Sequence, residues 1–332
     1  MSTMTAAALY GFGNADTFEL ASIPKPGPAP GEVLIRVAYA GINPADWKDR
    51  EGYLSQFYDI HFPHIVGFDA AGTVDRVGEC VTAFAPGDRV LTVSRVGQGG
   101  QGSYAEFLPV PADRVAKIPD ELPLLQAAVL PVAALTAWQA LFDEARGKLQ
   151  PGQAVLINGG SGGVGTFAVQ FARQASARVA ASCSGANADY VRQLGADLAI
   201  DYRQGRMPEA IAGWAGSGVD LLVDAVGPDS LPDISRLVRP GGRLVSIATL
   251  NRDGDIAALT AAAAAHGIQK VFAVMDDQNC ASRLSAIAAQ VAGGDLRLPP
   301  IQTFELAEVA TAHRMIETGH VRGKLALRVC GE

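Results

Sequence analysis

The feature of this sequence that most constrains its fold is a glycine-rich loop between an apolar segment and a helical one. The stretch is VLINGGSGGVGTFAVQFA, in which Gly160, Gly162 and Gly165 fit the spacing G-x-G-x-x-G. Glycines allow a tight turn and the close approach of a phosphate, whose charge the free N–H groups of the following helix bind. With a strand before it and a helix after it, the motif predicts a dinucleotide site. The expected contacts are Gly160, Ser161, Gly162, Gly163, Val164 and Gly165.

The chain around this loop alternates between short apolar strands and helices. Strands are expected at 154–158, 178–182, 198–202, 219–226 and 243–249. Runs this uniformly apolar are typical of parallel strands that are buried on both faces. The alternation predicts a Rossmann-type, doubly wound α/β domain over residues 124–275. A last strand at 268–274 is expected at the edge of the sheet, and pairing with a second subunit is one way to cover it, so we expect a homodimer.

The two ends of the chain do not follow this alternation. Segments 31–41 and 87–94 are short β-branched runs between turn residues, so the first third is expected to be β-rich. The last part of the chain is expected to form a helix, a strand, a helix and a strand. We therefore assign residues 1–123 and 276–332 to one discontinuous domain.

Composition and charge restrict the partners of this chain. Its net charge is −7 over 332 residues, and no cluster of Lys or Arg offsets it, which argues against nucleic acid and anionic membranes. No stretch approaches the roughly 20 apolar residues of a membrane span, and the first residues lack the features of a signal peptide. The four cysteines are widely spaced, as expected for reduced thiols in a cytoplasmic protein.

The residues after the second and third strands indicate which dinucleotide binds. NAD sites usually have an acidic residue after the second strand, but here Ser182 and Ser184 stand there and the nearest acid is Asp189. Hydroxyl groups can bond a 2′-phosphate, which a carboxylate would repel. Tyr202 and Arg203 end the third strand, where a guanidinium can bind phosphate and a ring can lie against adenine. These residues favour NADP(H), although the loop lacks a basic residue of its own.

Several longer motifs make the sequence similar to a known family. It resembles the zinc-independent quinone oxidoreductases of the medium-chain dehydrogenase/reductase superfamily. The motifs are AGINPADWKDREG (40–52), VGFDAAGTVDRVGECVTAFAPGDRV (66–90), GSYAEF (102–107), LPVAALTAWQAL (130–141), GGSGGVG (159–165), LGADLAIDYR (194–203) and GHVRGKLALRV (319–329). The resemblance implies a GroES-like catalytic domain, a Rossmann domain, and an active site between them. Short-chain reductases are excluded, because no tyrosine has a lysine four residues later.

The same resemblance argues against a metal. Zinc-dependent relatives have a cysteine ligand where this chain has Asn43, and Gly-His-Glu where residues 67–69 read Gly-Phe-Asp. A catalytic zinc needs three protein ligands, and a phenylalanine ring supplies none. His61 and His64 would share a face only on a helix, which the proline between them opposes. We therefore expect no metal site, and we interpret the two histidines as loop or cleft-wall residues.

The resemblance also implies roles for individual residues. Asn43 and Thr136 are expected near the nicotinamide, and Tyr53 and Tyr58 follow on a segment expected to line the cleft. These four residues are the catalytic candidates. The cofactor contacts predicted besides the glycine loop are Asn43, Thr136, Ser182, Ser184, Tyr202, Arg203, Val226, Phe272, Val274, Arg322 and Lys324. Asp46 is interpreted as a structural residue that hydrogen-bonds backbone turns.

These predictions together indicate a hydride-transfer enzyme without a Lewis acid. A quinone or an α,β-unsaturated carbonyl suits such an enzyme, because conjugation spreads the charge that arrives with the hydride. We therefore expect NADPH-dependent reduction of one of these small molecules. The alternatives are an enoyl-thioester reductase or an alcohol dehydrogenase-like enzyme on the same scaffold, and an NADPH-binding structural protein without activity.

Overall fold

The computed structural model describes residues 2–96, 100–231, 233–247, 254–273 and 279–330. The chain divides into two compact units. The first comprises Met1–Leu135, Asp276–Leu296 and Pro300–Glu332, and the second comprises Thr136–Met275 and Arg297–Pro299. The first unit is thus discontinuous. The division falls after Leu135, inside helix α3 (Pro131–Phe142), whereas the sequence analysis placed it after residue 123.

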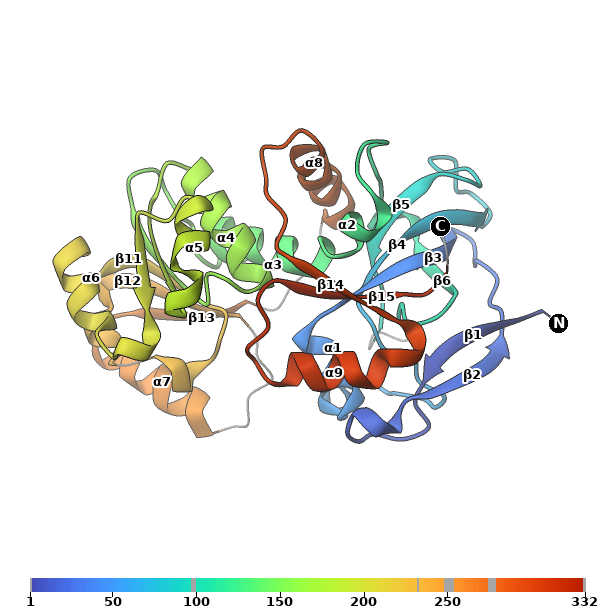
Figure 1. The fold of residues 1–332 in the computed structure, drawn as a ribbon, viewed down its shortest axis with the longest axis horizontal. Helices are drawn as coiled ribbons and strands as arrows, with labels where there is room; N and C mark the ends of the chain where they lie inside the picture. The colour runs from blue at the N-terminus through green and yellow to red at the C-terminus, as the bar shows by residue number, and fades with distance from the viewer. Residues whose placement is uncertain (1, 97–99, 232, 248–253, 274–278, 331–332) are drawn as a thin grey trace. The chain divides into compact units, whose positions relative to one another are not determined.

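The second unit is built on a six-stranded parallel sheet in the order β10-β9-β8-β11-β12-β13. Its strands are β8 (Ala154–Asn158), β9 (Arg178–Cys183), β10 (Leu198–Asp201), β11 (Val219–Asp224), β12 (Val238–Ile247) and β13 (Gln269–Ala273). Its helices are α4 (Gly163–Gln174), α5 (Ala188–Gln193), α6 (Met207–Ala215) and α7 (Gly254–Ala265). Figure 1 shows α4 and α5 on one side of this sheet and α7 on the other. The Rossmann-type sheet predicted from the alternation is confirmed.

The central strands of this sheet are apolar because helices cover both of their faces. All five residues of β8 are buried, and Leu156 packs with Leu222 and Leu244 of the neighbouring strands. The chain runs outward from β8 to β9 and β10 on one side, and from β11 to β12 and β13 on the other. The loops after β8 and β11 therefore diverge. Ligands of such sheets bind where the strand order reverses in this way.

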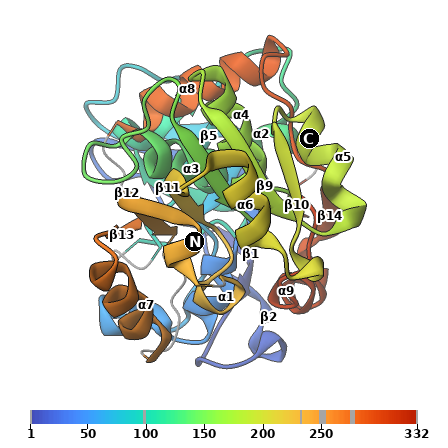
Figure 2. The ribbon, with the colours of Figure 1, turned by 90° about the vertical axis from the view of Figure 1, so that its left-hand side faces the viewer.

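The first unit contains a seven-stranded, mostly antiparallel sheet and a separate hairpin. The sheet has the order β14-β15-β3-β4-β5-β7, and β6 pairs with β3. Its strands are β3 (Glu32–Ile42), β4 (Asp69–Val77), β5 (Arg89–Val93), β6 (Phe107–Pro111), β7 (Val115–Lys117), β14 (Ile301–Glu305) and β15 (Lys324–Arg328), and the hairpin is β1 (Thr3–Ala8) with β2 (Glu19–Pro24). Its helices are α1 (Pro44–Arg50), α2 (Leu124–Ala128), α8 (Cys280–Ala292) and α9 (Val309–Glu317). Helix α1 lies against α9, as Figures 1 and 2 show.

Membrane spans are absent from the residues that the structure describes. None of their helices combines the length and the apolar character that crossing a bilayer requires.

A chain of polar side chains runs through the apolar interior of the first unit. The Arg50 guanidinium donates to the Gly13 carbonyl oxygen at 2.9 Å and to the Glu317 carboxylate at 2.6 Å, and lies 3.2 Å from His313 Nδ1. His313 Nε2 lies 3.2 Å from the Tyr104 hydroxyl, which donates to Asp46 Oδ2 at 3.0 Å. Arg50, His313, Tyr104 and Asp46 are all buried. The chain joins α9 to the start of α1.

The direction of these hydrogen bonds fixes the protonation of His313. Arginine can only donate, so His313 Nδ1 must accept, and the ring proton is on Nε2, which donates to Tyr104. His313 is therefore neutral. Burial, and then the charge of Arg50, lower the pKa of His313 to about 3. The neutral ring and the phenol together link the Arg50 cation to the Asp46 carboxylate.

We expect the neutral His313 to make the folded state sensitive to acid. Its pKa is lower in the folded chain than the ordinary value of 6.5, so below that pH the unfolded state binds the proton and the folded state does not. The free energy of unfolding should then fall with decreasing pH between about 6.5 and 3, at up to about 1.4 kcal/mol per pH unit from this residue. Replacing His313 by glutamine, which accepts from Arg50 and donates to Tyr104, should reduce this slope. Urea unfolding at several pH values measures it.

The matched control for this measurement is His320→Gln, because His320 follows α9 and is exposed. That variant should keep the pH dependence of the parent protein. A His313→Gln protein with an unchanged slope between pH 6 and 4 would contradict the neutral state of His313.

Candidate functional site

The glycine loop has the geometry that a bound phosphate requires. Gly160, Ser161 and Gly162 form the loop, and Gly163, Val164 and Gly165 form the first turn of α4. A Cβ on Gly165 would lie 2.1 Å from the Gly159 carbonyl oxygen, so only glycine allows this close packing. A Cβ on Gly162 would meet only that oxygen, at 3.4 Å, which leaves space over the main chain. Because Gly162 precedes α4 and has no side chain, no side-chain hydrogen bond caps the first turn of this helix. The residues present thus fit a dinucleotide pyrophosphate.

Ser182 holds this loop in place. Its hydroxyl donates to Asn158 Oδ1 at 2.6 Å and accepts the Gly159 N–H at 3.0 Å. Asn158 in turn donates to Asp224 Oδ1 at 2.9 Å, which connects the ends of three neighbouring strands. The side chain of Ser182 is buried, and its hydrogen bonds are made inside the loop. Its expected contact with a 2′-phosphate therefore competes with these bonds and stays a prediction.

The region expected to bind the adenosine contains charges of both signs. Tyr202 is 44% exposed, and the exposed Arg203 guanidinium lies 5.7 Å from the centre of its ring. Ser184 is half-buried. Asp201 was missed by the sequence analysis: a Cβ on Gly185 would lie 2.6 Å from Asp201 Oδ2. This carboxylate therefore lies where a 2′-phosphate is expected. The signal was present in the sequence, because Asp201 belongs to the predicted third strand and pairs with the end of the second.

The remaining predicted cofactor contacts are spread over both units. Val226, just after β11, is 51% exposed, and its Cγ2 lies 2.8 Å from where a Cβ on Gly159 would be, so it belongs to the same loop edge. Thr136 is buried in α3, and Phe272 is exposed on β13. Arg322 is exposed just before β15. Val274 lies outside the described residues.

A second cluster of polar side chains lies in the first unit, where three strand ends meet. Asn43 follows β3, Asp69 begins β4 and Lys324 begins β15, and these strands are neighbours in the sheet. Asn43 Nδ2 donates to Asp69 Oδ2 at 2.9 Å. Lys324 Nζ donates to Asn43 Oδ1 at 2.6 Å and lies 3.3 Å from Asp69 Oδ2. The three residues are 3%, 0% and 5% exposed, so this is a buried ion pair with an amide between its partners.

The ion pair leaves the Asn43 side chain with one N–H group that can bind a ligand. Burial raises the pKa of Asp69, and the charge of Lys324 and the hydrogen bonds from Asn43 and Val132 lower it. The Asn43 carbonyl is taken by Lys324 and one of its N–H groups by Asp69, which leaves one N–H free to donate. Because the ammonium draws electrons through the amide, this N–H is a stronger donor than that of an isolated asparagine. It can hydrogen-bond an oxygen on which negative charge develops.

Lys324 has a different environment from the one expected for a cofactor ligand. Besides Asn43 and Asp69, its ammonium donates to the Ile42 carbonyl at 2.9 Å, so its three protons all have partners. The predicted contact between Lys324 and the cofactor stays a prediction. The structure instead places Lys324 where it orients Asn43, a role that the sequence analysis did not foresee.

Asp46 fixes the backbone on both sides of this cluster. Its carboxylate accepts the N–H of Asn43 at 2.6 Å and the N–H of Phe68 at 3.1 Å, in addition to the hydroxyl of Tyr104. Burial raises the pKa of Asp46 to about 7, against the opposing effect of these donors. The structural role predicted for Asp46 is confirmed. Asp46 thus holds the backbone of Asn43 and of Phe68, the two positions at which zinc-dependent relatives would have metal ligands.

The donor set at these positions does not suit zinc. Asn43 presents an amide, Phe68 a ring without a lone pair, and Asp69 a carboxylate already paired with Lys324. A tetrahedral zinc site takes nitrogen, sulfur or carboxylate ligands, at least three of them from the protein. Within the described ranges, no group of three His, Cys, Asp or Glu side chains is placed to hold a metal.

The segment after α1 presents aromatic side chains. Tyr53 is half-buried in the short 3-10 helix Tyr53–Gln56, and Tyr58 is 39% exposed. The ring of Phe12 meets that of Phe62 edge to face at 5.1 Å, and Phe57 is exposed beside Tyr58. These are two separate ring pairs of the first unit, and the Phe12 ring also lies against Gly52, directly before Tyr53. Exposed rings of this kind can pack against a flat, unsaturated ligand.

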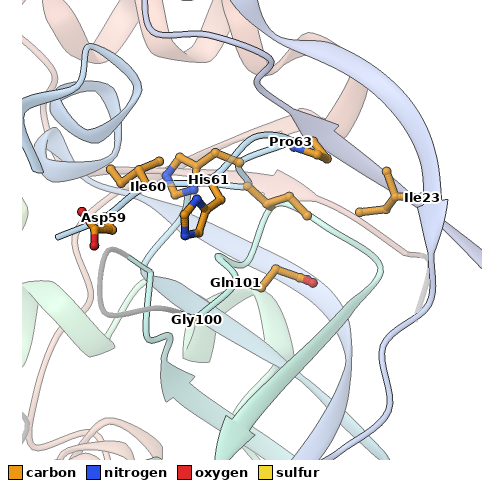
Figure 3. Close-up of a pocket in the computed structure, with 9 residues that line it drawn as sticks. Ile23, Asp59, Ile60, His61, Pro63, Gly100 and Gln101 are labelled. Atoms are coloured by element: carbon orange, nitrogen blue, oxygen red, sulfur yellow. The ribbon is translucent and has the colours of Figure 1, made fainter. Parts of the chain in front are cut away.

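His61 and His64 line a cavity of about 260 Å³ in the first unit. In Figure 3, Asp59 and Ile23 lie at opposite ends of this cavity, with His61 between them. His64 Nε2 lies 2.9 Å from Asp49 Oδ2, so the buried carboxylate orients this ring. Both histidines are wall residues here, as the sequence analysis interpreted them.

Comparison with known proteins agrees with this arrangement. Residues 29–120 match the family model described as alcohol dehydrogenase GroES-like domain, and residues 194–327 match the one described as zinc-binding dehydrogenase. A chloroplast envelope quinone oxidoreductase homolog of Arabidopsis thaliana is 40% identical over 213 residues, which are 63% of this chain and 63% of that relative. The human mitochondrial NAD(P)H oxidoreductase RTN4IP1 is 34% identical over 90% of this chain and 82% of its own length.

A solved structure extends the similarity to the fold. The quinone oxidoreductase from Coxiella burnetii superposes with a TM-score of 0.85 at 30% identity, covering 99% of this chain and all of that one. Sequence similarity over 90% of the chain, the two family models and this superposition agree with each other and with the motifs. The chain belongs to the medium-chain dehydrogenase/reductase superfamily, in its quinone oxidoreductase branch.

Proposed function

We propose that this protein is a zinc-independent oxidoreductase that transfers a hydride from NADPH to a quinone or an α,β-unsaturated carbonyl compound. The observation that carries the proposal is the clamped amide of Asn43. Its one free N–H is a fixed, polarised donor at a position where zinc-dependent relatives have a metal ligand. A conjugated acceptor needs such a donor at its oxygen, and it does not need a Lewis acid.

Different residues are proposed to bind the cofactor, to polarise the acceptor and to position it. The glycine loop and the first turn of α4 would hold the pyrophosphate, and Tyr202, Arg203 and Ser184 the adenosine end. Asn43, Thr136, Val226 and Phe272 are the proposed neighbours of the nicotinamide end. When bound, the reduced nicotinamide supplies the hydride. Asn43 donates to the acceptor oxygen, Lys324 and Asp69 fix the direction of that bond, and the rings of Tyr53 and Tyr58 position the acceptor.

The choice of NADPH over NADH depends on two opposing charges. The exposed Arg203 guanidinium favours a 2′-phosphate, whereas the Asp201 carboxylate disfavours it. We propose NADPH because a guanidinium can form two hydrogen bonds to a phosphate, while one oxygen of Asp201 is already occupied by the backbone N–H of Arg203 at 3.1 Å.

Two further parts of the proposal concern the assembly and location of the protein. Strand β13 pairs only with β12 in the described part of the chain, and its outer edge can accept a strand of a second subunit. A homodimer through this edge is therefore proposed. A cytoplasmic location also stays a prediction, since the two relatives above are named as chloroplast and mitochondrial proteins.

The experiment that tests the function is a screen of NADPH oxidation with quinones, 2-alkenals, enones and enoyl-CoA, with metal analysis of the same sample. We expect turnover of a quinone or an enone by a protein that lacks stoichiometric zinc. Activity that is lost with a removable zinc ion would contradict the mechanism. Preference for enoyl-CoA would favour the enoyl-thioester reductase, and binding of NADPH without turnover of any acceptor would favour a structural protein.

The cofactor choice leads to a prediction for a pair of neighbouring residues. Arg203→Met should raise the KM for NADPH about tenfold, the usual effect of losing one charge-assisted hydrogen bond, and leave the KM for NADH unchanged. Asp201→Asn keeps an oxygen that accepts the Arg203 N–H but removes the charge, and it should lower the KM for NADPH. Steady-state kinetics with both cofactors measures this. Equal effects of Arg203→Met on both cofactors would show that Arg203 does not contact the 2′-phosphate.

The buried ion pair leads to a second prediction, which separates stability from catalysis. Lys324→Met leaves the Asp69 carboxylate buried without a cation, and it should lower the free energy of unfolding by about 3–5 kcal/mol. The double variant Asp69→Leu with Lys324→Met removes both charges and should regain most of that stability. Its kcat should nevertheless stay about 100-fold below that of the parent, because nothing orients or polarises Asn43. A stable and fully active double variant would exclude this role of the pair.

A further inference from the structure

Lys48, on the short helix α1, is a buried cation without a counter-ion. Its side chain is almost fully enclosed, since the residue is 6% exposed. In the described residues, no carboxylate lies within 4 Å of its ammonium and no hydrogen bond satisfies it. The nearest favourable group is the ring of Trp47, whose centre is 5.3 Å away. The charge of Glu51 also acts on it, but that carboxylate is bound to Arg50 at 3.1 Å.

The other buried cations of this unit are all satisfied. Arg50 is paired with Glu317, Lys324 with Asp69, and Arg114 donates to the Ser94 carbonyl. Taking a charged group out of water without a partner costs several kcal/mol, so proteins rarely contain one that has no use. Burial lowers the pKa of Lys48 to about 8, which makes its ammonium a better proton donor than an exposed lysine.

The position of Lys48 on α1 separates it from the polar chain of the interior. Asp46, Asp49 and Arg50 lie on one face of the helix, where they contact Tyr104, His64 and His313. Lys48 is two residues beyond Asp46, about 200° around the helix axis, so it lies on the other face. Helix α1 begins directly after Asn43, and five residues of helix place Lys48 about 7.5 Å along the axis from it. An extended lysine side chain covers most of that distance, and an acceptor bound between the two residues can bridge the rest.

We propose that Lys48 is the proton donor of the reaction. It delivers its proton to the oxygen or the α-carbon of the reduced acceptor. The proposal rests on the proposed function and extends it by naming the second catalytic group beside Asn43. The unpaired ammonium then has a partner during turnover, namely the oxyanion that forms as the hydride arrives. This accounts for a buried cation that the fold itself leaves unpaired.

The step is balanced in atoms and electrons. The acceptor gains a hydride at its β-carbon, and the electron pair of its C=C bond moves toward the carbonyl oxygen. One N–H bond of the Lys48 ammonium breaks, its proton bonds to the acceptor, and Lys48 is left as a neutral amine. The oxidised cofactor leaves, and the amine takes a proton from water. A quinone is reduced to a hydroquinone by the same transfer of one hydride and one proton.

The test compares Lys48→Met and Lys48→Arg with the parent, using full-length protein, NADPH and a 2-alkenal. Lys48→Met should lower kcat about 100-fold, within the usual range for losing a general acid, with the Kd for NADPH changed less than twofold in a fluorescence titration. The kcat of the parent should fall above about pH 8, where Lys48 loses its proton, and this decrease should be absent from Lys48→Met. Lys48→Arg keeps the charge but does not release a proton, so it should regain only part of kcat.

The charged groups around α1 bear on the origin of that pH dependence. On the helix itself they are Asp46, whose pKa burial raises to about 7, and Asp49, Arg50 and Glu51. Helix α9, which packs against it, adds His313, Arg314 and Glu317, and the 3-10 helix Tyr53–Gln56 contributes only the phenol of Tyr53. An electron-poor quinone provides a further readout. Because the reduced form of such a quinone is a weak base, Lys48→Met should lower kcat with the quinone much less than kcat with the 2-alkenal. A purely structural role of Lys48 would not produce this difference.

Two controls make the outcome decisive. Lys148→Met alters an exposed lysine paired with Glu144 and should change neither kcat nor its pH dependence. His61→Gln removes a titratable ring that lines the cavity of the first unit, and the decrease above pH 8 should persist. The proposal is overturned if Lys48→Met keeps both kcat and this decrease, if His61→Gln removes it, or if Lys48→Met loses NADPH affinity instead of kcat. A parent protein that binds NADPH but reduces no acceptor would overturn the proposed function, and this role of Lys48 with it.

Discussion

The site in the first unit depends on the need to compensate a carboxylate that the sheet buries completely. Asp69 begins β4 with no exposed surface, and it is tolerable there only because Lys324 and Asn43 reach it from the two neighbouring strand ends. Those strands are far apart in sequence, so the ion pair forms only when the last strand has joined the sheet. The orientation of Asn43 is thus a consequence of the completed fold rather than of its local sequence.

A second buried carboxylate, Asp46, extends this constraint from side chains to the backbone. It holds the N–H groups of Asn43 and Phe68, and Tyr104 and His313 connect it to the cation of Arg50 at the other end of α1. Every buried charge along this path has a partner, which makes the loop geometry rigid. Lys48 differs from these groups, because the described residues satisfy the other buried charges and supply no counter-ion for this one. That contrast, more than the burial of Lys48 alone, points to a ligand.

How much of this was predictable from the sequence depends on how local the signal is. The parallel sheet and the glycine loop follow from the spacing of apolar residues and glycines. Most strands lie within two residues of the predicted bounds, whereas the strand predicted at 243–249 already begins at Val238. The direction of a side chain at a strand end depends on register with a neighbouring strand. Ser182 therefore turned out to hold the loop, Lys324 to hold Asn43, and Asp201 to lie beside the predicted phosphate position. The boundary expected after residue 123 stays a prediction. The compact units divide after Leu135, inside the continuous helix α3, whose pattern does not show which of its residues pack with which unit.

The replacement of metal ligands by Asn43 and Phe68 changes which reactions this scaffold can support. A zinc ion stabilises an alkoxide by direct coordination, which is worth several kcal/mol. A single N–H donor in a water-poor site contributes about 2.7–4 kcal/mol, judged from the loss of one oxyanion-hole donor in other enzymes. That is too little for an isolated alkoxide of high basicity, but it suits an enolate or a hydroquinone anion, in which conjugation already spreads the charge. A proton donor in addition to the amide lowers the requirement further, because it removes the charge as it forms. In the proposed mechanism, an amide and an ammonium without a metal would therefore select conjugated acceptors.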